Sequence, residues 1–263
     1  VSFVFDNNPN TIPDTISEGL IQSKDYEKTP DGIWYFHLRF KDENGWGDTI
    51  NYKIKIDTNP PHPFEVTVDN GGDPTNPQPN LYFETIDDVS GISGYKIRIG
   101  EGNFLDLMLA QINPFTIPPQ KPGNYKVIVR ALDQASNIVR SKTFLNIDPL
   151  ETPKINVWPE KYISGEETFY IEGTSLPNVE IIIFLKQGDK EIKRWKTLSN
   201  DKGEWFFSTK ELIKPGIYDL LVMAQDKRGA VSNLSGASKI EATFSGLIMG
   251  NLMITFKNLI WIL

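Results

Sequence analysis

Two histidines and no cysteine limit the catalytic chemistry open to this chain of 263 residues. The lack of cysteine excludes disulfides, thiolate nucleophiles and zinc sites built on thiolates. His37 falls on the outward face of a predicted strand, and His62 falls in a predicted linker. Neither has zinc-ligand spacing, a nucleophile elbow or a His-Glu-x-x-His motif around it. We therefore expect ordinary surface histidines, no catalytic residue, no metal ligand and no cofactor, and we predict that the chain is not an enzyme.

Acidic turns are the second set of residues that could do chemistry. The aspartates that could bind calcium in predicted turns and a linker are Asp57, Asp69, Asp73, Asp87 and Asp88. Calcium takes about six to eight oxygen ligands, and no Asp-x-Asp-x-Asp-Gly loop gathers them here. Aspartate also caps turns by accepting hydrogen bonds from nearby backbone. We expect turn capping at these positions and no requirement for calcium.

Exposed aromatic residues could form a platform on which a sugar ring stacks. Trp46, in a predicted loop, and Trp195 are the candidates for such a ligand-stacking role. A stacking site usually combines several coplanar rings, and the sequence shows no such group. Polysaccharide therefore stays a possible partner without an assigned site.

The elements that must position these residues recur along the chain. Three segments align without gaps, each running from Gly to Asp with a spacing of about 90 residues, the size of one small sandwich domain. They are GIWYFHLRFKD from Gly32, GNYKVIVRALD from Gly123 and GIYDLLVMAQD from Gly216. A second landmark, Ile-Asp or Ile-Glu, keeps the same spacing at Ile56, Ile147 and Ile240.

Each of the three segments alternates with period two, which indicates a half-buried strand. The side chains predicted to face inward are Trp34, Phe36, Leu38 and Phe40, then Tyr125, Val127, Val129 and Ala131, then Tyr218, Leu220, Val222 and Ala224. Asp-rich turns follow all three strands, as expected for hairpins.

These motifs resemble bacterial immunoglobulin-like and fibronectin type III-like repeats of cell-surface and secreted proteins. The resemblance rests on FETIDDVSGISGYKIRI from Phe83, on IDTNPP from Ile56, and on the aromatic two residues after each repeat glycine, where the family carries its tyrosine corner. Gly173 to Pro177 and Asp201 to Trp205 match a second bacterial immunoglobulin-like subtype. The two resemblances together imply that Trp34 and Trp205 are core residues. The resemblance implies an all-β fold of tandem immunoglobulin-like sandwiches, and it is nearly silent on function.

The repeat spacing divides the chain into three domains and a tail. We expect a partial domain at residues 1–57, whose strands A and B are missing, and further domains at 58–148 and 149–242. The short linkers between them carry prolines, which favour extended, semi-rigid backbone.

The tail at residues 243–263 changes to an apolar composition interrupted by Asn251, Lys257 and Asn258. Three interpretations stay open: an interfacial amphipathic helix, a membrane span that begins near Leu259, or a buried C-terminal element. We expect a helical membrane anchor of one of the first two kinds.

Net charge excludes one class of partner. The chain carries −7 at pH 7, and phosphate binding needs clustered Lys and Arg. The densest basic stretch, Lys190 to Lys196, is diluted by Glu191, so we expect no nucleic acid partner.

The sequence therefore favours a non-catalytic stalk or adhesive module on a cell surface. We expect an extracytoplasmic, membrane-anchored bacterial protein whose partners are the membrane, through the tail, and other surface proteins or polysaccharide. The alternative is an accessory, carbohydrate-binding module of a larger secreted hydrolase.

Overall fold

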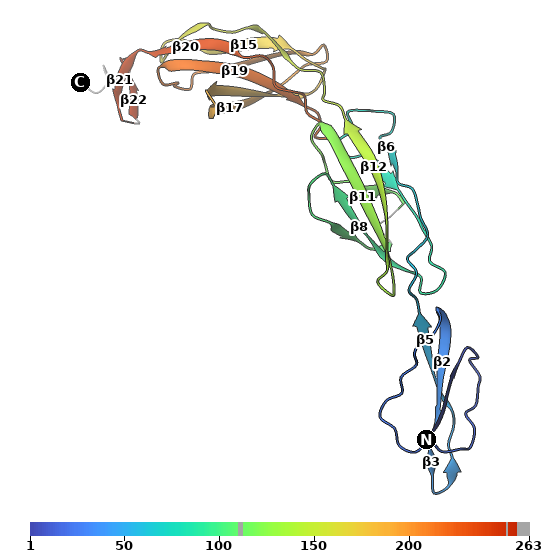
Figure 1. The fold of residues 1–263 in the computed structure, drawn as a ribbon. Coiled ribbons are helices and arrows are strands. Elements are labelled where there is room, and N and C mark those ends of the chain that lie inside the picture. Colours follow the sequence, from blue (N-terminus) through green and yellow to red (C-terminus); the bar gives the residue numbers. More distant parts are fainter. Residues whose placement is uncertain (110–112, 251, 257–263) are drawn as a thin grey trace. The chain divides into compact units, whose positions relative to one another are not determined.

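The computed structural model describes residues 1–109, 113–250 and 252–256, and its regular structure is almost entirely β (Figure 1). Contacts between Cα atoms group these residues into two compact units. The first unit comprises Val1–Asp69, Asn80–Phe115 and Tyr125–Leu145, and the second comprises Asn70–Pro79, Thr116–Asn124 and Asn146–Leu263. The predicted domain boundaries after residues 57, 148 and 242 stay a prediction.

The first repeat is a single antiparallel sheet in the order β1-β2-β5. Its strands are β1 (Ser2–Asp6), β2 (Gly32–Arg39) and β5 (Ile50–Ile56), with a small hairpin of β3 (Lys41–Asp42) and β4 (Gly45–Trp46) beside them. The predicted inward side chains of β2 are only half-buried, and Phe40 is 52% exposed. Residues 7–31 supply no strand to cover them.

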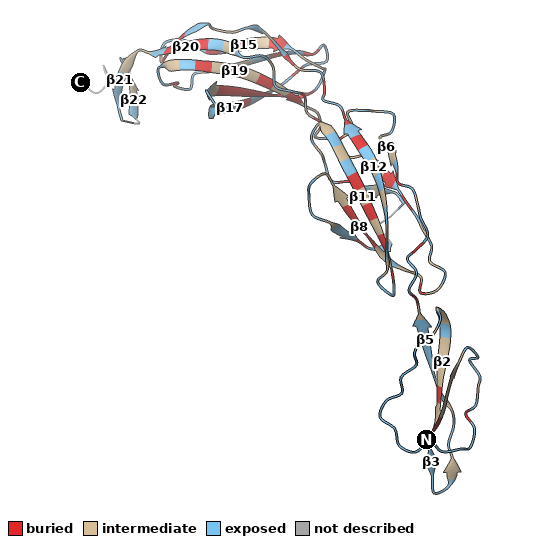
Figure 2. Ribbon diagram, in the orientation of Figure 1, coloured by how far each residue is buried: buried red, intermediate tan, exposed pale blue. Residues whose placement is uncertain are grey.

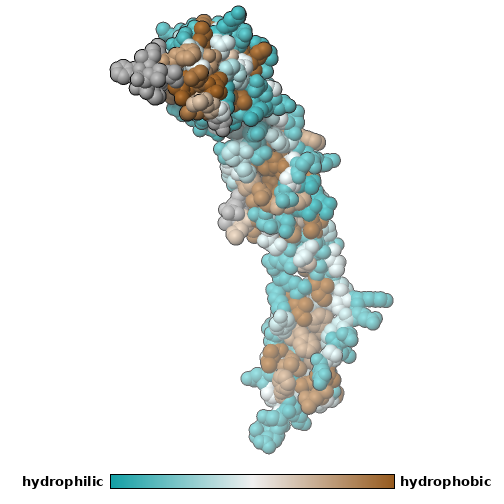
Figure 3. Space-filling view, turned by 90° about the vertical axis from the view of Figure 1, so that its left-hand side faces the viewer, coloured by the Kyte–Doolittle hydropathy of each residue, from teal (hydrophilic) through white to brown (hydrophobic). Residues whose placement is uncertain are grey.

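The uncovered face of β1-β2-β5 forms an apolar groove of about 400 Å³. Phe3, Phe5, Phe36, Leu38 and Phe40 line it. In Figure 3, apolar side chains reach the surface over this repeat, at the bottom of the view. The partial domain expected at residues 1–57 stays a prediction.

His37 corrects one expectation from the sequence. The alternation of β2 places it on the outward face, but its side chain is fully buried. Asn51 Oδ1 accepts a hydrogen bond from His37 Nδ1 at 2.6 Å, and Asp6 Oδ1 lies 3.3 Å from Nε2. His37 is therefore a structural residue that links β2 to both of its neighbours, and not a surface histidine.

The second repeat is a sandwich of two sheets, ordered β10-β7-β6 and β12-β11-β8-β9. The first sheet holds β6 (Thr67–Asp69), β7 (Asn80–Tyr82) and β10 (Phe115–Thr116), and the second holds β8 (Ile92–Ile99), β9 (Leu105–Leu107), β11 (Gly123–Asp133) and β12 (Ile138–Ile147). The rings of Phe83, after β7, and Tyr95, on β8, pack 5.2 Å apart. Buried residues alternate along β11, in red in Figure 2.

The third repeat packs a three-stranded sheet, β13-β15-β18, against a five-stranded one, β14-β20-β19-β16-β17. The first contains β13 (Lys154–Val157), β15 (Phe169–Thr174) and β18 (Glu204–Thr209), and the second contains β14 (Lys161–Ser164), β16 (Glu180–Gln187), β17 (Lys190–Leu198), β19 (Gly216–Gln225) and β20 (Ser238–Phe244). Strand β14 pairs with β20 in parallel, and the other pairs are antiparallel. The all-β fold of tandem immunoglobulin-like sandwiches is confirmed, and β2, β11 and β19 are the three predicted repeat strands.

The start of the tail is a hairpin of β21 (Gly246–Met249) and β22 (Leu252–Thr255). The expectation of a helix is therefore wrong for these residues. Asn251, Lys257, Asn258 and Leu259 lie outside the described residues. No helix in the described part of the chain has the length and apolar character that a membrane span requires.

The glycine of the Gly-x-x-x-Pro motif generates the first prediction. Gly173 on β15 lies opposite Trp205 on β18, and a Cβ there would overlap the Trp205 indole and the carbonyl oxygen of Lys154. Gly173→Ala should lower the free energy of unfolding of the third repeat by about 1–3 kcal/mol, because overpacking must displace the ring or the strand. Urea unfolding followed by tryptophan fluorescence measures it.

Gly236→Ala is the matched control in the same repeat. An added Cβ at Gly236 meets no atom within 4 Å. The urea concentration at the unfolding midpoint of this variant should therefore stay near that of the unaltered chain. Equal stability of the two variants would show that the indole does not require a glycine opposite it.

Candidate functional site

Three carboxylates converge where β5 ends and the second repeat begins, inside the first unit. One oxygen from each of Asp57, Asp87 and Asp133 lies within 4.8 Å of the others. Asp57 follows β5, Asp87 precedes β8, and Asp133 ends β11. The first and last are buried, at 9% and 1% exposure. We call these three residues the acidic triad.

Asp87 caps the turn that leads into β8. Its Oδ1 accepts hydrogen bonds from the backbone N–H groups of Val89, Ser90 and Gly91 at 3.2, 2.8 and 2.8 Å. Burial alone would raise the pKa of Asp87, but these N–H donors bring it below its ordinary value. The carboxylate is therefore ionised at neutral pH.

Asp133 and Asp57 are also occupied by nearby donors. Asp133 accepts from the backbone N–H of Asn137 at 2.8 Å and from its Nδ2 at 2.9 Å. Asp57 accepts from the backbone N–H groups of Asn59 and Ser90, both at 3.2 Å. Capping accounts for the position of each carboxylate, and the donors' N–H dipoles offset part of the repulsion between them.

An oxygen-only triad could hold a hard divalent cation, and calcium is the ion that such ligands suit. The structure brings together Asp57 and Asp87 from the sequence-derived candidates, and it adds Asp133. It does not bring in the others: Asp88 pairs with His62 at 2.8 Å, and Asp69 and Asp73 lie outside the triad. The missed signal is the Asp133-to-Asn137 turn, which the sequence shows but which only the fold places beside Asp57.

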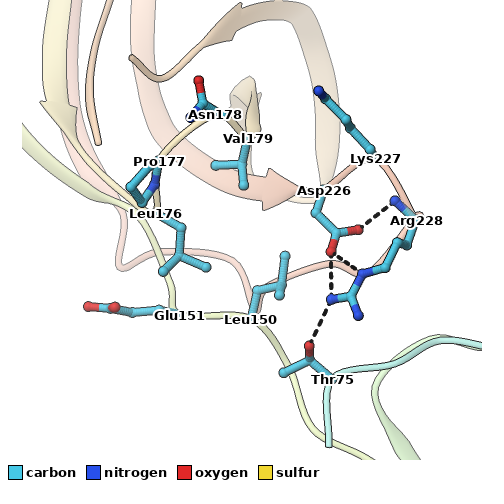
Figure 4. Close-up of a pocket in the computed structure, with 10 residues that line it drawn as sticks. All are labelled: Thr75, Leu150, Glu151, Leu176, Pro177, Asn178, Val179, Asp226, Lys227 and Arg228. Carbon is cyan, nitrogen blue, oxygen red and sulfur yellow. Dashed lines mark hydrogen bonds and ion pairs between the residues drawn. The ribbon is translucent and has the colours of Figure 1, made fainter. Parts of the chain in front are cut away.

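In the equivalent turn of the third repeat, an arginine side chain neutralises the aspartate. Arg228 binds Asp226 at 2.8 Å and also contacts Thr75, as Figure 4 shows. It makes a further ion pair with Asp73, which belongs to the same unit. Hydrogen bonds from Thr75 and from Arg228 lower the pKa of Asp73. These groups edge a pocket of about 600 Å³ with an apolar floor that includes Leu150. The guanidinium of Arg228 is therefore committed to the carboxylates of Asp226 and Asp73.

The two tryptophans proposed for ligand stacking have different environments. Trp195 is 8% exposed and packs against Phe169 and Phe207, with ring centroids 5.5 and 5.3 Å away. The expectation of an exposed Trp195 is therefore wrong. Trp46 is half-buried, and the side chains of Arg39 and Lys41 lie over its ring. A ligand-stacking role for Trp46 stays a prediction.

No family model and no curated protein matches the chain. Solved structures with a similar fold include a tetra-tandem repeat from the extending region of a large adhesion protein, with 16% identity, a TM-score of 0.33, and coverage of 91% of this chain and 66% of that one. Fibronectin(III)-like modules of Clostridium thermocellum CbhA give 14% identity, a TM-score of 0.28, and coverage of 72% and 100%. A 1.5-MDa bacterial ice-binding adhesin gives 12% identity, a TM-score of 0.24, and coverage of 81% of this chain and 73% of that one. The second of these is described as fibronectin(III)-like, and all three TM-scores are low, so the function of this chain rests on its own residues.

The acidic triad generates the second prediction. We expect EDTA to leave the melting temperature of the chain within about 2 °C of its value in calcium, because backbone and amide N–H groups already occupy the three carboxylates. Thermal melting followed by circular dichroism, with EDTA or with calcium, measures the difference.

The opposite result would have a recognisable form. A larger drop in EDTA that calcium restores, and that disappears in Asp133→Asn, would make the acidic triad a calcium site. Asp88→Asn is the matched control, because Asp88 is an exposed neighbour that lies outside the triad.

Proposed function

We propose that this chain is a non-catalytic structural module of an extracytoplasmic surface protein, in which tandem immunoglobulin-like sandwiches serve as a stalk. The observation that carries the proposal is the linker after β5. Both flanking repeats hold it by hydrogen bonds, and a stalk needs joints that resist bending.

The first repeat holds the linker through Asp31, which directly precedes β2. Its carboxylate accepts hydrogen bonds from the backbone N–H of Thr58 at 3.1 Å and from Asn59 Nδ2 at 2.7 Å. The Thr58 hydroxyl also donates to it, at 3.0 Å. A carboxylate that accepts several bonds fixes two successive linker residues to the sheet that they leave.

The second repeat holds the same linker through Asn137. Its Nδ2 lies 3.2 Å from the carbonyl oxygen of Asp57 and 3.1 Å from that of Asn59, besides its bond to Asp133. Lys55 Nζ adds a bond to the carbonyl oxygen of Ser90 at 3.2 Å. Pro60 and Pro61 restrict the backbone of the linker further. These restraints support a stiff joint.

The histidine environments support the non-catalytic part of the proposal. His37 is buried between Asn51 and Asp6, and His62 is exposed beside Asp88. In the described part of the chain, neither ring contacts a hydroxyl that it could activate as a nucleophile. The alternative function is an accessory module of a larger secreted hydrolase, and a groove of the third repeat lined by Tyr170, Glu172 and Phe206 favours it.

The tail supports a proposal of membrane association. Five apolar side chains of the hairpin and the residue after it are 45–60% exposed: Leu247, Ile248, Met249, Leu252 and Phe256. A cluster of exposed apolar side chains is unusual unless something covers it. We propose that the interfacial region of a membrane does so, which would anchor the stalk at this end.

The linker generates the third prediction. The backbone amides of Thr58 and Asn59 should exchange hydrogen slowly, and Asn137→Ala should speed their exchange by about tenfold, which corresponds to about 1.4 kcal/mol of lost protection. Hydrogen exchange with mass spectrometry on peptides that cover residues 56–62 measures both rates.

Asn103→Ala is the control, because Asn103 is an exposed loop residue of the same repeat and should leave linker exchange unchanged. Unprotected exchange at Thr58 and Asn59 in the unaltered chain would describe a free hinge. The stalk proposal would then lose its main support.

The hairpin generates the fourth prediction. The full chain should float with phosphatidylcholine vesicles in a density gradient, and the triple change Ile248→Ser, Met249→Ser and Leu252→Ser should abolish flotation by removing apolar area that the membrane would bury. Phe144→Ser and Ile217→Ser remove exposed apolar residues elsewhere and should float normally. Equal behaviour of the triple variant and the unaltered chain would end the anchor proposal.

A further inference from the structure

A groove of about 520 Å³ lies on the outer face of the sheet β13-β15-β18 in the third repeat. It combines aromatic, carboxylate and amide side chains, and no lysine or arginine lines it. The side chains used in the argument are Asn156, Tyr170, Glu172, Glu204 and Phe206. We name this surface the sugar groove, after the class of ligand that its side chains select.

Strand register sets the two aromatic rings on one face. Glu172 on β15 pairs with Phe206 on β18, and Tyr170 pairs with Ser208. Tyr170 and Phe206 are therefore diagonal neighbours, about 7–8 Å apart, which is within reach of one ligand. They are 41% and 63% exposed, so both rings are open to solvent.

The core side chains of the same strands explain why these aromatics are exposed. Phe169 and Ile171 on β15 and Trp205 on β18 point inward and are buried, at 3% exposure or less. Because side chains alternate along a strand, Tyr170 and Phe206 must point outward. A core that already contains its large residues gives them no packing role, and an exposed aromatic pair is then available for binding.

Polar groups beside the two rings have hydrogen-bonding atoms that no described residue uses. Tyr170 donates its hydroxyl hydrogen bond to Glu172 Oε2 at 2.6 Å, which orients the carboxylate across the groove. Among the described residues, no partner binds the Asn156 amide or the second oxygen of Glu172. These groups provide acceptors and one amide donor beside the aromatic faces.

The combination selects one class of ligand. Aromatic faces bind the C–H surface of a sugar ring, and carboxylate and amide groups bind its hydroxyls. Among the described residues neither Glu172 nor Glu204 forms an ion pair, and their negative charges disfavour phosphate, sulfate and acidic polysaccharides. A peptide strand would add to a sheet edge, whereas the groove runs over a face. We propose that the sugar groove binds a neutral oligosaccharide, with adjacent rings on Tyr170 and Phe206 and with hydroxyls held by Glu172 and Asn156.

Titration calorimetry tests this with the full chain and four probes: cellohexaose, chitohexaose, mannohexaose and the acidic hexamer of galacturonic acid. At least one neutral hexamer should bind at millimolar concentration or tighter, and the acidic hexamer should not. Phe206→Ala and Tyr170→Ala should each weaken binding by about tenfold or more. Both residues are exposed, so the variants should fold and melt like the unaltered chain.

Ile217→Ala is the matched control, because Ile217 is a 65% exposed apolar residue on β19, in the other sheet of the same repeat. It should bind the hexamer as the unaltered chain does. Failure of all three neutral hexamers to bind, a preference for the acidic one, or unchanged affinity in both aromatic variants would each overturn the proposal. None of these results bears on linker exchange, so the stalk proposal stands or falls separately.

Discussion

Each repeat depends on one constraint: the inward side chains of its central strand must be covered by a second sheet. In the second and third repeats this cover exists, and Val127, Val129, Leu220 and Val222 are fully buried. In the first repeat the same strand positions carry Phe36 and Leu38, which are only half-buried, and Phe40, just after β2, is half-exposed. Burial contributes about 25 cal/mol for each Å² of apolar surface, so the uncovered sheet lacks much of the stabilisation that its neighbours have.

The repeat strands were predictable because their signal is local. Alternation and the Gly-to-Asp span place β2, β11 and β19 from sequence alone, since the side-chain period of a strand is a property of its own residues. The same signal misplaced His37. The sequence identifies two faces of β2 but not what covers each one. Asp6 and Asn51 reach the histidine from neighbouring strands, through a register that only the folded sheet fixes.

Trp195 and the secondary structure at the start of the tail were mispredicted for related reasons. Along β17 the polar and apolar residues do not alternate cleanly, and a register shift opposite Leu185 breaks the period that would have marked Trp195 as inward. In the tail, apolar composition suggested a helix, whereas Gly250, with a φ of +61°, supplies the turn of a hairpin. The acidic triad was half predictable: its turns are visible in the sequence, but their convergence is tertiary.

The same turn in two repeats shows what the fold fixes and what it leaves free. Asp133 Oδ1 accepts the backbone N–H of Asn137, and Asp226 Oδ1 accepts that of Ala230, both four residues ahead. This bond closes the turn, so the fold requires one oxygen of each aspartate.

The second oxygen is not needed for the turn, and the two repeats use it differently. In the second repeat it meets the Asn137 amide, which also holds the linker, whereas in the third it meets the Arg228 guanidinium. The strength of a hydrogen bond from a neutral side-chain amide changes little with salt concentration. Salt weakens an exposed ion pair, because dissolved ions screen its charges. The same turn geometry can therefore make contacts that differ in their sensitivity to salt. The sequence changes only the partner of the second carboxylate oxygen, which the turn itself does not need.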